Sequence, residues 1–417
     1  MTTCETLAEK GYTLPEGFCV GAGRAEINPP LGISLAGHGV ENAKTRLSTE
    51  NWDSLEFCCT ALSDGTELAL LCTFDCSCIA EHLAAAMLKL LEEKFGIPPK
   101  NVILQATHTH AGPVMYSRHE AFKKVGEYLD EIVHPGMLRA VEEAIRDLTP
   151  ASLFIGKGKT EGLNFVRRYV SRADGSFLGN WPEKGQDGTK IRHESEPDEQ
   201  MQIIRFARSG KKDVILVNWQ CHPTSSGGSK KTNTSSDWPG ILRNTVGEAE
   251  DAHVVFHQGA AGNLIPYSAI EGEIGYPGDA FRQHGALISQ VALDILKHNM
   301  TPAKTGKLVI TKEWFPMKRK EGRDVTIPLS VIAAGDIAFA TTPNESFCQN
   351  GMQVKEGSPF PVTFFCELTN GDGGYVPAEE CFVNGGYEVK ICPFGKGSGE
   401  RIAGELLYML QGNRIEE

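Results

Sequence analysis

The sequence lacks three features that would each indicate a protein class. It has no run of about 18 uninterrupted apolar residues, so we expect no transmembrane helix. It has no long basic stretch, and 41 basic against 53 acidic residues give a net charge of −12, which disfavours nucleic-acid binding. It has no Cys-x-x-Cys pair, and its 12 cysteines are scattered. We therefore expect reduced core thiols rather than a disulfide framework.

The N-terminus also lacks the order of a signal peptide. Its first ten residues carry acidic side chains early, where a secretion signal would place basic and then apolar ones. With the unpaired cysteines, this predicts a cytoplasmic protein whose partner is a small molecule, without stable membrane insertion. A hydrophobic content of 41% and a charged content of 23% are typical of a well-packed globular chain.

Strand and helix patterns alternate along the chain, which predicts an α/β fold with loops at strand ends supplying the chemistry. No segment has the composition of a linker, so we expect one domain over residues 1–417, in which 303–417 could form a C-terminal subdomain. The strand-like runs are 68–74, 101–108, 213–218, 253–258, 307–311 and 335–341, and the helical stretches are 80–95, 120–148 (interrupted near Pro135) and 277–298.

The clearest local signal is the segment THTHAGP at 107–113. If the preceding strand continues through it, His108 and His110 point to the same face, because side chains alternate along a strand. Two imidazoles at a strand end suit a metal or acid/base site, although a hydrogen-bonded structural pair is an equal alternative. His222, in NWQCHPT, also follows an apolar strand and would by itself be more typical of a structural histidine. Strand ends converge in α/β folds, however, and similar residues follow other strands, namely His257, Glu345 and Tyr375.

Six segments also carry a family resemblance. In the same order along the chain, they resemble segments of the neutral, non-lysosomal ceramidase family, and the match spans nearly the whole chain. The resemblance implies that family's catalytic domain, an α/β fold with mixed β-sheets flanked by helices. The segments are GAGRAEINPP (21–30), THTHAGP (107–113), NWQCHPTS (218–225), GNLIP (262–266), GDIAFATTPNES (335–346) and GGYVPAEE (373–380).

Characterised members of that family are zinc amidases, so the resemblance implies one zinc ion per chain. Carried over position by position, its ligands become His108, His222, Glu345 and Tyr375. Two imidazoles with oxygen ligands leave room for a water molecule, as in a catalytic rather than a structural zinc site. Mixed nitrogen and oxygen ligands also accept Mn²⁺, Fe²⁺ or Co²⁺, which leaves the identity of the metal open.

The resemblance assigns further roles around this centre. His110 resembles a family histidine that could pass a proton to the leaving nitrogen. Either Arg167 or Arg168, in NFVRRY, resembles a family arginine that contacts the substrate or the developing oxyanion; a surface salt bridge is the alternative for both. Asp237, in SSDWPG, and Tyr387, in FVNGGYE, are expected beside the substrate, Asp237 orienting a ligand and Tyr387 lining the pocket.

The chain departs from the family pattern in ways that bear on function. Ile265 occupies the position of a family serine regarded as important for catalysis, so a seryl intermediate is excluded there. We expect no C-terminal immunoglobulin-like domain and no secretion signal, features that accompany lipid-facing relatives. The sequence therefore predicts a zinc-dependent hydrolase that cleaves the C–N (amide) bond of a soluble small molecule by metal-activated water. The alternatives are an esterase, lactonase or lyase acting on a polar metabolite, or a non-catalytic ligand-binding descendant.

Overall fold

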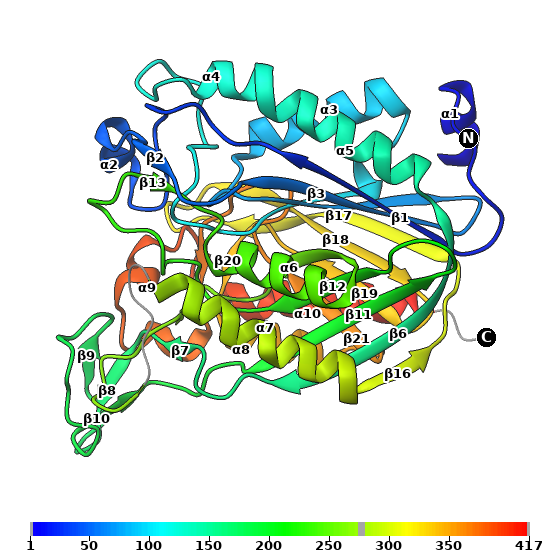
Figure 1. The fold of residues 1–417 in the computed structure, drawn as a ribbon. Helices are drawn as coiled ribbons and strands as arrows, with labels where there is room; N and C mark the ends of the chain where they lie inside the picture. The colour runs from blue at the N-terminus through cyan, green and yellow to red at the C-terminus, as the bar shows by residue number, and fades with distance from the viewer. Residues whose placement is uncertain (1–2, 274–279, 415–417) are drawn as a thin grey trace.

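The computed structural model describes residues 3–273 and 280–414. A nine-stranded mixed sheet, the large sheet, has the strand order β14-β12-β11-β6-β1-β3-β4-β5, with β16 also paired to β6 (Figure 1). The small sheet has the order β17-β18-β19-β21. The strands are β1 (Cys19–Glu26), β3 (Glu56–Ser63), β4 (Leu68–Phe74), β5 (Val102–Ala106), β6 (Thr149–Lys159), β11 (Gln200–Arg208), β12 (Val214–Trp219), β14 (His253–Gln258), β16 (Met300–Ala303), β17 (Leu308–Lys318), β18 (Asp324–Ala334), β19 (Ile337–Thr341) and β21 (Val362–Cys366).

The two sheets pack against each other, and helices cover their outer faces (Figure 1). In β3, Phe57 and Cys59 face the helices whereas Cys58 and Leu62 face the small sheet. A strand buried on both faces needs an almost continuous apolar run, which the sequence supplies. The helices are α3 (Glu81–Phe95), α4 (Val125–Tyr128) and α5 (His134–Arg146) on one part of the large sheet, α6 (Asp237–Glu250) and α7 (Phe281–His298) on the other part, and α8 (Cys348–Gly357) and α10 (Ser398–Asn413) on the small sheet.

Short elements complete the chain and build most of the walls around the strand ends. The chain from β6 to β11 forms short strands, as its polar composition predicts. These elements are α1 (Thr3–Glu9), α2 (Val40–Thr45), β2 (Glu50–Asn51), β7 (Phe165–Val166), β8 (Tyr169–Ser171), β9 (Phe177–Gly179), β10 (Ile191–His193), β13 (Asn233–Thr234), β15 (Leu264–Ile265), β20 (Glu345–Ser346), β22 (Tyr375–Val376) and α9 (Tyr387–Ile391).

The fold class predicted from the sequence is confirmed, with two local corrections. The predicted helix at 80–95 forms α3 and ends at Gly96 in the left-handed region, with φ 74°. The strand predicted over 101–108 ends at Ala106. The helical stretch at 120–148 continues past Pro135, because a π-helical segment (Leu129–Val133) joins α4 to α5 just before it and the missing N–H of Pro135 falls at this change in hydrogen bonding. Of the helix predicted at 277–298, residues 277–279 lie outside the described residues.

Two glycines in the segment at 21–30 serve packing rather than chemistry. Helix α5 lies so close to β1 that a Cβ on Gly21 would come within 2.0 Å of the Ala144 carbonyl oxygen. At Gly23, a Cβ would come within 1.9 Å of the Ala140 carbonyl oxygen. A larger residue at either position would push the helix off the sheet.

Within the predicted subdomain, residues 308–413 include the small sheet and its helices α8 and α10. Its inner face, with Phe339 and Phe364, packs on Leu71 and Ile103 of the large sheet. Whether this part counts as a subdomain stays a prediction.

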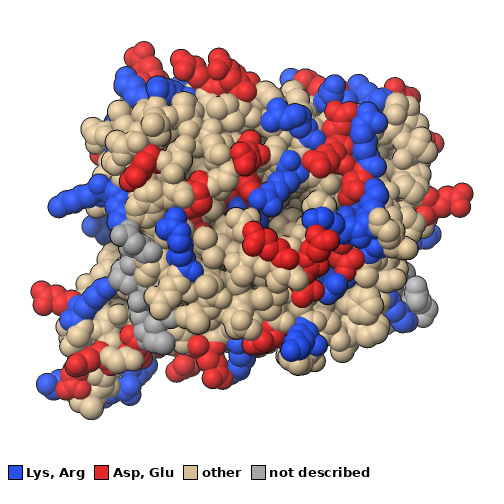
Figure 2. All heavy atoms as spheres, viewed as in Figure 1, with Lys and Arg blue, Asp and Glu red and all other residues tan. Residues whose placement is uncertain are grey.

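On the face shown in Figure 2, basic and acidic side chains alternate, without a continuous basic patch among the described residues. Across residues 3–273 and 280–414, none of the helices has both the length and the apolar character that crossing a membrane requires.

A buried ion cluster ties helix α6 to the end of β4. Arg243 is 2% exposed and donates two hydrogen bonds to Asp75, at 2.9 and 2.5 Å, with Glu56 3.4 Å away. Asp75 also accepts hydrogen bonds from the Thr107 hydroxyl at 3.0 Å and from the Glu56 amide at 2.9 Å. This carboxylate thereby joins β3, α6 and the segment that carries His108.

We expect Asp75→Ala to lower the free energy of unfolding by about 3–5 kcal/mol, because it leaves the Arg243 guanidinium in the core with only a distant partner. Urea denaturation measures this change. Lys89→Ala, which breaks the exposed ion pair with Glu93, should cost less than about 1 kcal/mol. Equal losses in the two variants would contradict the prediction.

A layer of polar side chains is buried where the two sheets meet. The His257 ring contacts the rings of Phe339 and Phe364, and its Nδ1 is 2.9 Å from Gln105 Oε1. Burial lowers the pKa of His257 to about 3. The folded protein therefore holds this imidazole neutral, whereas the unfolded chain protonates it below its ordinary pKa of 6.5.

Because the unfolded chain binds this proton more readily, metal-free protein should lose stability as pH falls from 7 to 5. For one such histidine the loss is about 2 kcal/mol. His257→Gln keeps an amide donor for Gln105 but does not titrate, so its stability should depend less steeply on pH. Urea unfolding at several pH values, with a chelator present, tests this; parallel pH profiles would show that His257 is not responsible.

Candidate metal centre

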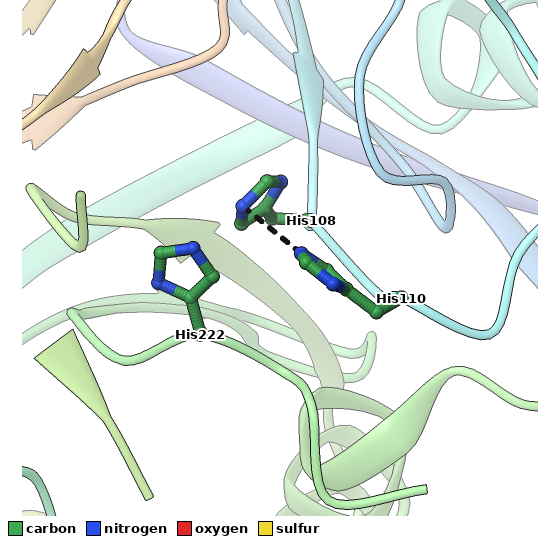
Figure 3. Close-up of side chains that lie close together, drawn as sticks. All are labelled: His108, His110 and His222. Carbon is green, nitrogen blue, oxygen red and sulfur yellow. Dashed lines mark hydrogen bonds between the residues drawn. The ribbon is translucent and has the colours of Figure 1, made fainter. Parts of the chain in front are cut away.

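His108 and His110 converge although they do not lie on a strand. The chain leaves β5 after Ala106, and His108 adopts a left-handed conformation with φ 72°, which costs about 1–3 kcal/mol for a residue other than glycine. The turn is held by hydrogen bonds from the His108 amide to the Cys76 carbonyl oxygen and from the His110 amide to that of Pro223, at 2.9 and 3.1 Å. The Nε2 atoms of the two rings lie 3.4 Å apart (Figure 3). The two histidines therefore come together as predicted, but through a strained turn rather than a continued strand.

His222 approaches the same point from the loop after β12. Its Nδ1 lies 2.8 Å from the Ala261 carbonyl oxygen and 2.9 Å from that of Leu264. His108 Nδ1 lies 2.5 Å from the Ser77 carbonyl oxygen. A carbonyl oxygen can only accept, so each Nδ1 carries the proton and each Nε2 presents a lone pair. Figure 3 shows the His222 ring facing the other two histidines.

Glu345 and Tyr375 complete the group from the C-terminal part of the chain. They are paired residues of the parallel strands β20 and β22. Glu345 Oε2 lies 3.2 Å from His108 Nε2 and 3.4 Å from His222 Nε2, and Tyr375 Oη lies 3.5 Å from His222 Nε2. The structure thus brings all four predicted ligands to one point.

The electrostatics of this point favour a cation. Burial disfavours charge on His108, but the Glu345 carboxylate more than offsets it and raises the His108 pKa. Burial would raise the pKa of Glu345, yet the two histidines hold it well below its usual range. Burial and Arg167 lower the pKa of His222 to about 4. Two imidazole lone pairs and a carboxylate oxygen face one another, so the group needs a proton or a metal ion among them.

His110 extends the donor set. Among the described residues, one ring nitrogen from each of His108, His110 and His222 lies within 4.8 Å of the other two. Burial and the neighbouring histidines hold the His110 pKa well below its usual range, so its ring is neutral. It can serve as a further nitrogen ligand or as a proton acceptor beside the centre.

Arg167 points at the centre. Its Nε donates to Glu388 Oε1 at 2.7 Å, its Nη2 donates to Tyr375 Oη at 3.1 Å, and its Nη1 is 3.5 Å from His222 Nε2. Burial opposes its charge, but Tyr375 and Glu388 outweigh burial and raise its pKa. Glu388 is fully buried and was not identified from the sequence, although it directly follows the predicted Tyr387.

Arg168 and Asp237 lie elsewhere. Arg168 pairs with Glu194 and Glu388 and donates to the Gly385 carbonyl oxygen. Asp237 accepts hydrogen bonds from the Ser226 amide and hydroxyl, and burial raises its pKa to about 6. As far as the described residues delimit the cavity, neither side chain lines it, and both hold neighbouring loops; their predicted roles at the substrate stay predictions.

A cavity of about 980 Å³ opens over the centre. Tyr387 lines it as predicted, and so does Ile265, the residue at the family's serine position. Sequence reasoning missed part of the wall, because the missed residues come from loops without periodicity; a tryptophan in a polar stretch, Trp181, is one of them. The other missed residues include His38, Tyr116, Lys184, Tyr267 and Asp372.

Comparisons with known proteins identify the family. A family model described as neutral/alkaline non-lysosomal ceramidase, N-terminal, matches residues 18–260. The neutral ceramidase of Pseudomonas aeruginosa is 25% identical over 269 residues, which cover 61% of this chain and 37% of that protein. A neutral ceramidase of Oryza sativa subsp. japonica is 27% identical over 158 residues, 36% of this chain and 19% of that protein. The chain thus matches less than two-fifths of the length of these curated relatives.

The crystal structure of the Pseudomonas aeruginosa neutral ceramidase has a TM-score of 0.74 with this chain and 16% sequence identity. The superposition covers 96% of this chain and 76% of the other, so the fold is shared over nearly the whole chain described here. Because the family model covers more than half of the sequence, the chain belongs to the neutral/alkaline non-lysosomal ceramidase family.

Proposed function

We propose that this protein is a metal-dependent hydrolase that cleaves the C–N bond of an amide. One observation carries the proposal: the Nε2 atoms of His108 and His222 lie 3.2 and 3.4 Å from Glu345 Oε2, and both Nδ1 protons are directed at carbonyl oxygens. The relatives described above are neutral ceramidases, which supports the same reaction class.

The residues fit zinc. His108 and His222 offer nitrogen, Glu345 and Tyr375 offer oxygen, and Glu345 Oε2 receives no hydrogen bond from the described residues. Such a set is typical of a catalytic site that keeps a position open for water. When bound, zinc would polarise the substrate carbonyl and lower the pKa of water to about 7.

The charged Arg167 guanidinium would orient the substrate carbonyl. It is held by Glu388, Tyr375 and the Gly262 carbonyl oxygen, which accepts from Nη2 at 2.9 Å. Its remaining donor, Nη1, points toward the ligand nitrogens. A carbonyl oxygen entering this space meets a positive charge that does not have to reorganise as negative charge develops.

The neutral His110 would move the proton. Its Nδ1 is buried without a hydrogen-bond partner among the described residues, and its ring contacts those of His108 and His222. An imidazole kept neutral beside the centre can accept a proton from the attacking water and deliver it to the leaving nitrogen. The side chain of Ile265 cannot attack the carbonyl, which leaves water as the nucleophile.

The cavity walls favour an amide with an apolar part. Trp181 and Tyr387 have ring centroids 5.2 Å apart, and Tyr387 and Tyr375 5.9 Å apart, so aromatic rings lead toward the centre. The volume is within the range of pockets that enclose a small molecule, about 300–1,000 Å³. We therefore propose a small-molecule amide whose apolar portion lies against these rings.

Purified protein supplied with zinc should carry about one zinc per chain, the number expected for a catalytic site with these ligands. His108→Ala and His222→Ala should each lose it, because each removes a nitrogen ligand; elemental analysis measures the content. His82→Ala, at an exposed position on α3, should keep its zinc. A wild-type protein that takes up no metal would refute the centre.

Arg167→Lys should lower kcat for amide hydrolysis by about 100-fold with a smaller change in KM, because a lysine cannot keep the planar contacts that aim Nη1 at the carbonyl. A panel of N-acyl amines, with matched esters, assayed on zinc-loaded and chelator-treated protein provides the measurement. Ester turnover without amide turnover would point to an esterase.

Arg168→Lys is the matched variant. Its guanidinium lies outside the cavity, so we expect a lower urea midpoint with kcat much less affected than in Arg167→Lys.

A pre-steady-state burst of amine from the wild type would argue against direct attack by water.

A further inference from the structure

Glu367 is a fully buried carboxyl group behind the candidate metal centre. It follows β21 and is not among the residues that line the cavity. Its Oε2 accepts a hydrogen bond from the Ser346 amide at 2.9 Å, and the Ala261 amide faces the carboxyl group and lowers its pKa, against the effect of burial. One side chain therefore joins two backbone segments that are far apart in the sequence.

One segment contains a candidate metal ligand, and the other orients one. Ser346 directly follows Glu345 in β20, and the Ala261 carbonyl oxygen accepts from His222 Nδ1 at 2.8 Å. On one side, the Glu367 carboxyl group therefore contacts the residue that follows the ligand Glu345. On the other side, it faces Ala261, the residue whose carbonyl oxygen sets the tautomer of His222.

The two segments are also packed so closely that neither can shift without moving the other. The Gly262 amide donates to the Ser346 carbonyl oxygen at 2.8 Å, and a Cβ on Gly262 would lie 2.8 Å from the Glu345 carbonyl oxygen. The Gly262 carbonyl oxygen accepts from Arg167 Nη2 at 2.9 Å. A shift of either segment would therefore move His222, Glu345 and Arg167 relative to one another.

We propose that Glu367 is a positioning residue of the metal centre, which sets the distance between Glu345 and His222 by accepting a hydrogen bond from the Ser346 amide where that segment packs against Ala261 and Gly262. The proposal rests on the proposed function, since it assumes that the centre binds a metal. Groups that orient metal ligands typically change metal affinity by about 10- to 100-fold when they are removed. Without the carboxyl group, the buried Ser346 amide would lose its acceptor and the segment would shift to reach another partner.

A merely structural role predicts a different result, and Asn101 provides the comparison. Asn101 is also fully buried, and its side-chain amide donates to the Leu68 carbonyl oxygen at 2.7 Å and to the Thr3 hydroxyl at 3.0 Å. It directly precedes β5, whereas His108 follows the other end of that strand. Asn101→Ala therefore removes a comparable buried polar link at the end of the strand away from the centre.

The experiment uses the full chain and three variants: Glu367→Met, Glu367→Gln and Asn101→Ala. Zinc affinity is measured by competition with a chromophoric chelator, and ligand geometry by the visible absorption of the cobalt(II) form. Glu367→Met should bind zinc about 10- to 100-fold more weakly and show an altered cobalt spectrum. Glu367→Gln keeps a carbonyl acceptor of the same reach and should restore both, and Asn101→Ala should be destabilised with both unchanged.

Wild-type affinity and spectrum in Glu367→Met would overturn the proposal, as would equal weakening in Asn101→Ala. If Glu367→Met does not fold, Glu367→Asp, whose carboxyl group falls short of the Ser346 amide, replaces it with the same expectation. Amide hydrogen exchange of segments 259–263 and 345–347 in the wild type is the second measurement, and rapid exchange at Ser346 would exclude the hydrogen bond. A wild type that binds no metal would refute the proposed function instead, and the exchange data would still report on Glu367.

Discussion

The hydrogen bonds from ring Nδ1 to backbone carbonyl oxygens are the interactions on which the centre depends. In His108 and His222 these bonds place the proton on the outer nitrogen and direct the other nitrogen inward. The inner nitrogens then face the carboxylate of Glu345, and the group needs a proton or a metal ion among these acceptors. Such a group of acceptors is unstable without a positive charge, and that need, rather than any single residue type, makes the site a candidate for a metal.

The layered fold explains how this arrangement is held. The large sheet supplies both histidines, from the loops after β5 and β12, and the C-terminal part of the chain supplies Glu345 and Tyr375. The centre therefore exists only when the two sheets pack against each other. The strain of His108, with φ 72°, is held by the same packing, and the Asp75–Arg243 pair fixes the neighbouring Thr107.

Family membership and the local chemistry carry different weight. The chain has the family's fold and presents the expected ligand set at one point, yet it matches only part of the length of its curated relatives. At the serine position it has Ile265, which lines the cavity beside aromatic rings. The geometry is compatible with attack by water. The sequence predicted a polar substrate, whereas the aromatic walls favour our proposal of an amide with an apolar part.

Sequence alone determined the α/β class and the helix at α3 with its glycine stop, because periodicity is a local property. The four candidate ligands followed from the family resemblance of short motifs. The sequence could not choose between Arg167 and Arg168, since adjacent side chains diverge and only the packing of β7 against β15 shows which one faces the cavity. It gave no sign of Glu388 or Glu367, because a lone glutamate looks the same in sequence whether it is solvated or buried. Tertiary structure decided these roles, because contacts across more than a hundred residues bring the two sheets together and determine which polar groups lose contact with water.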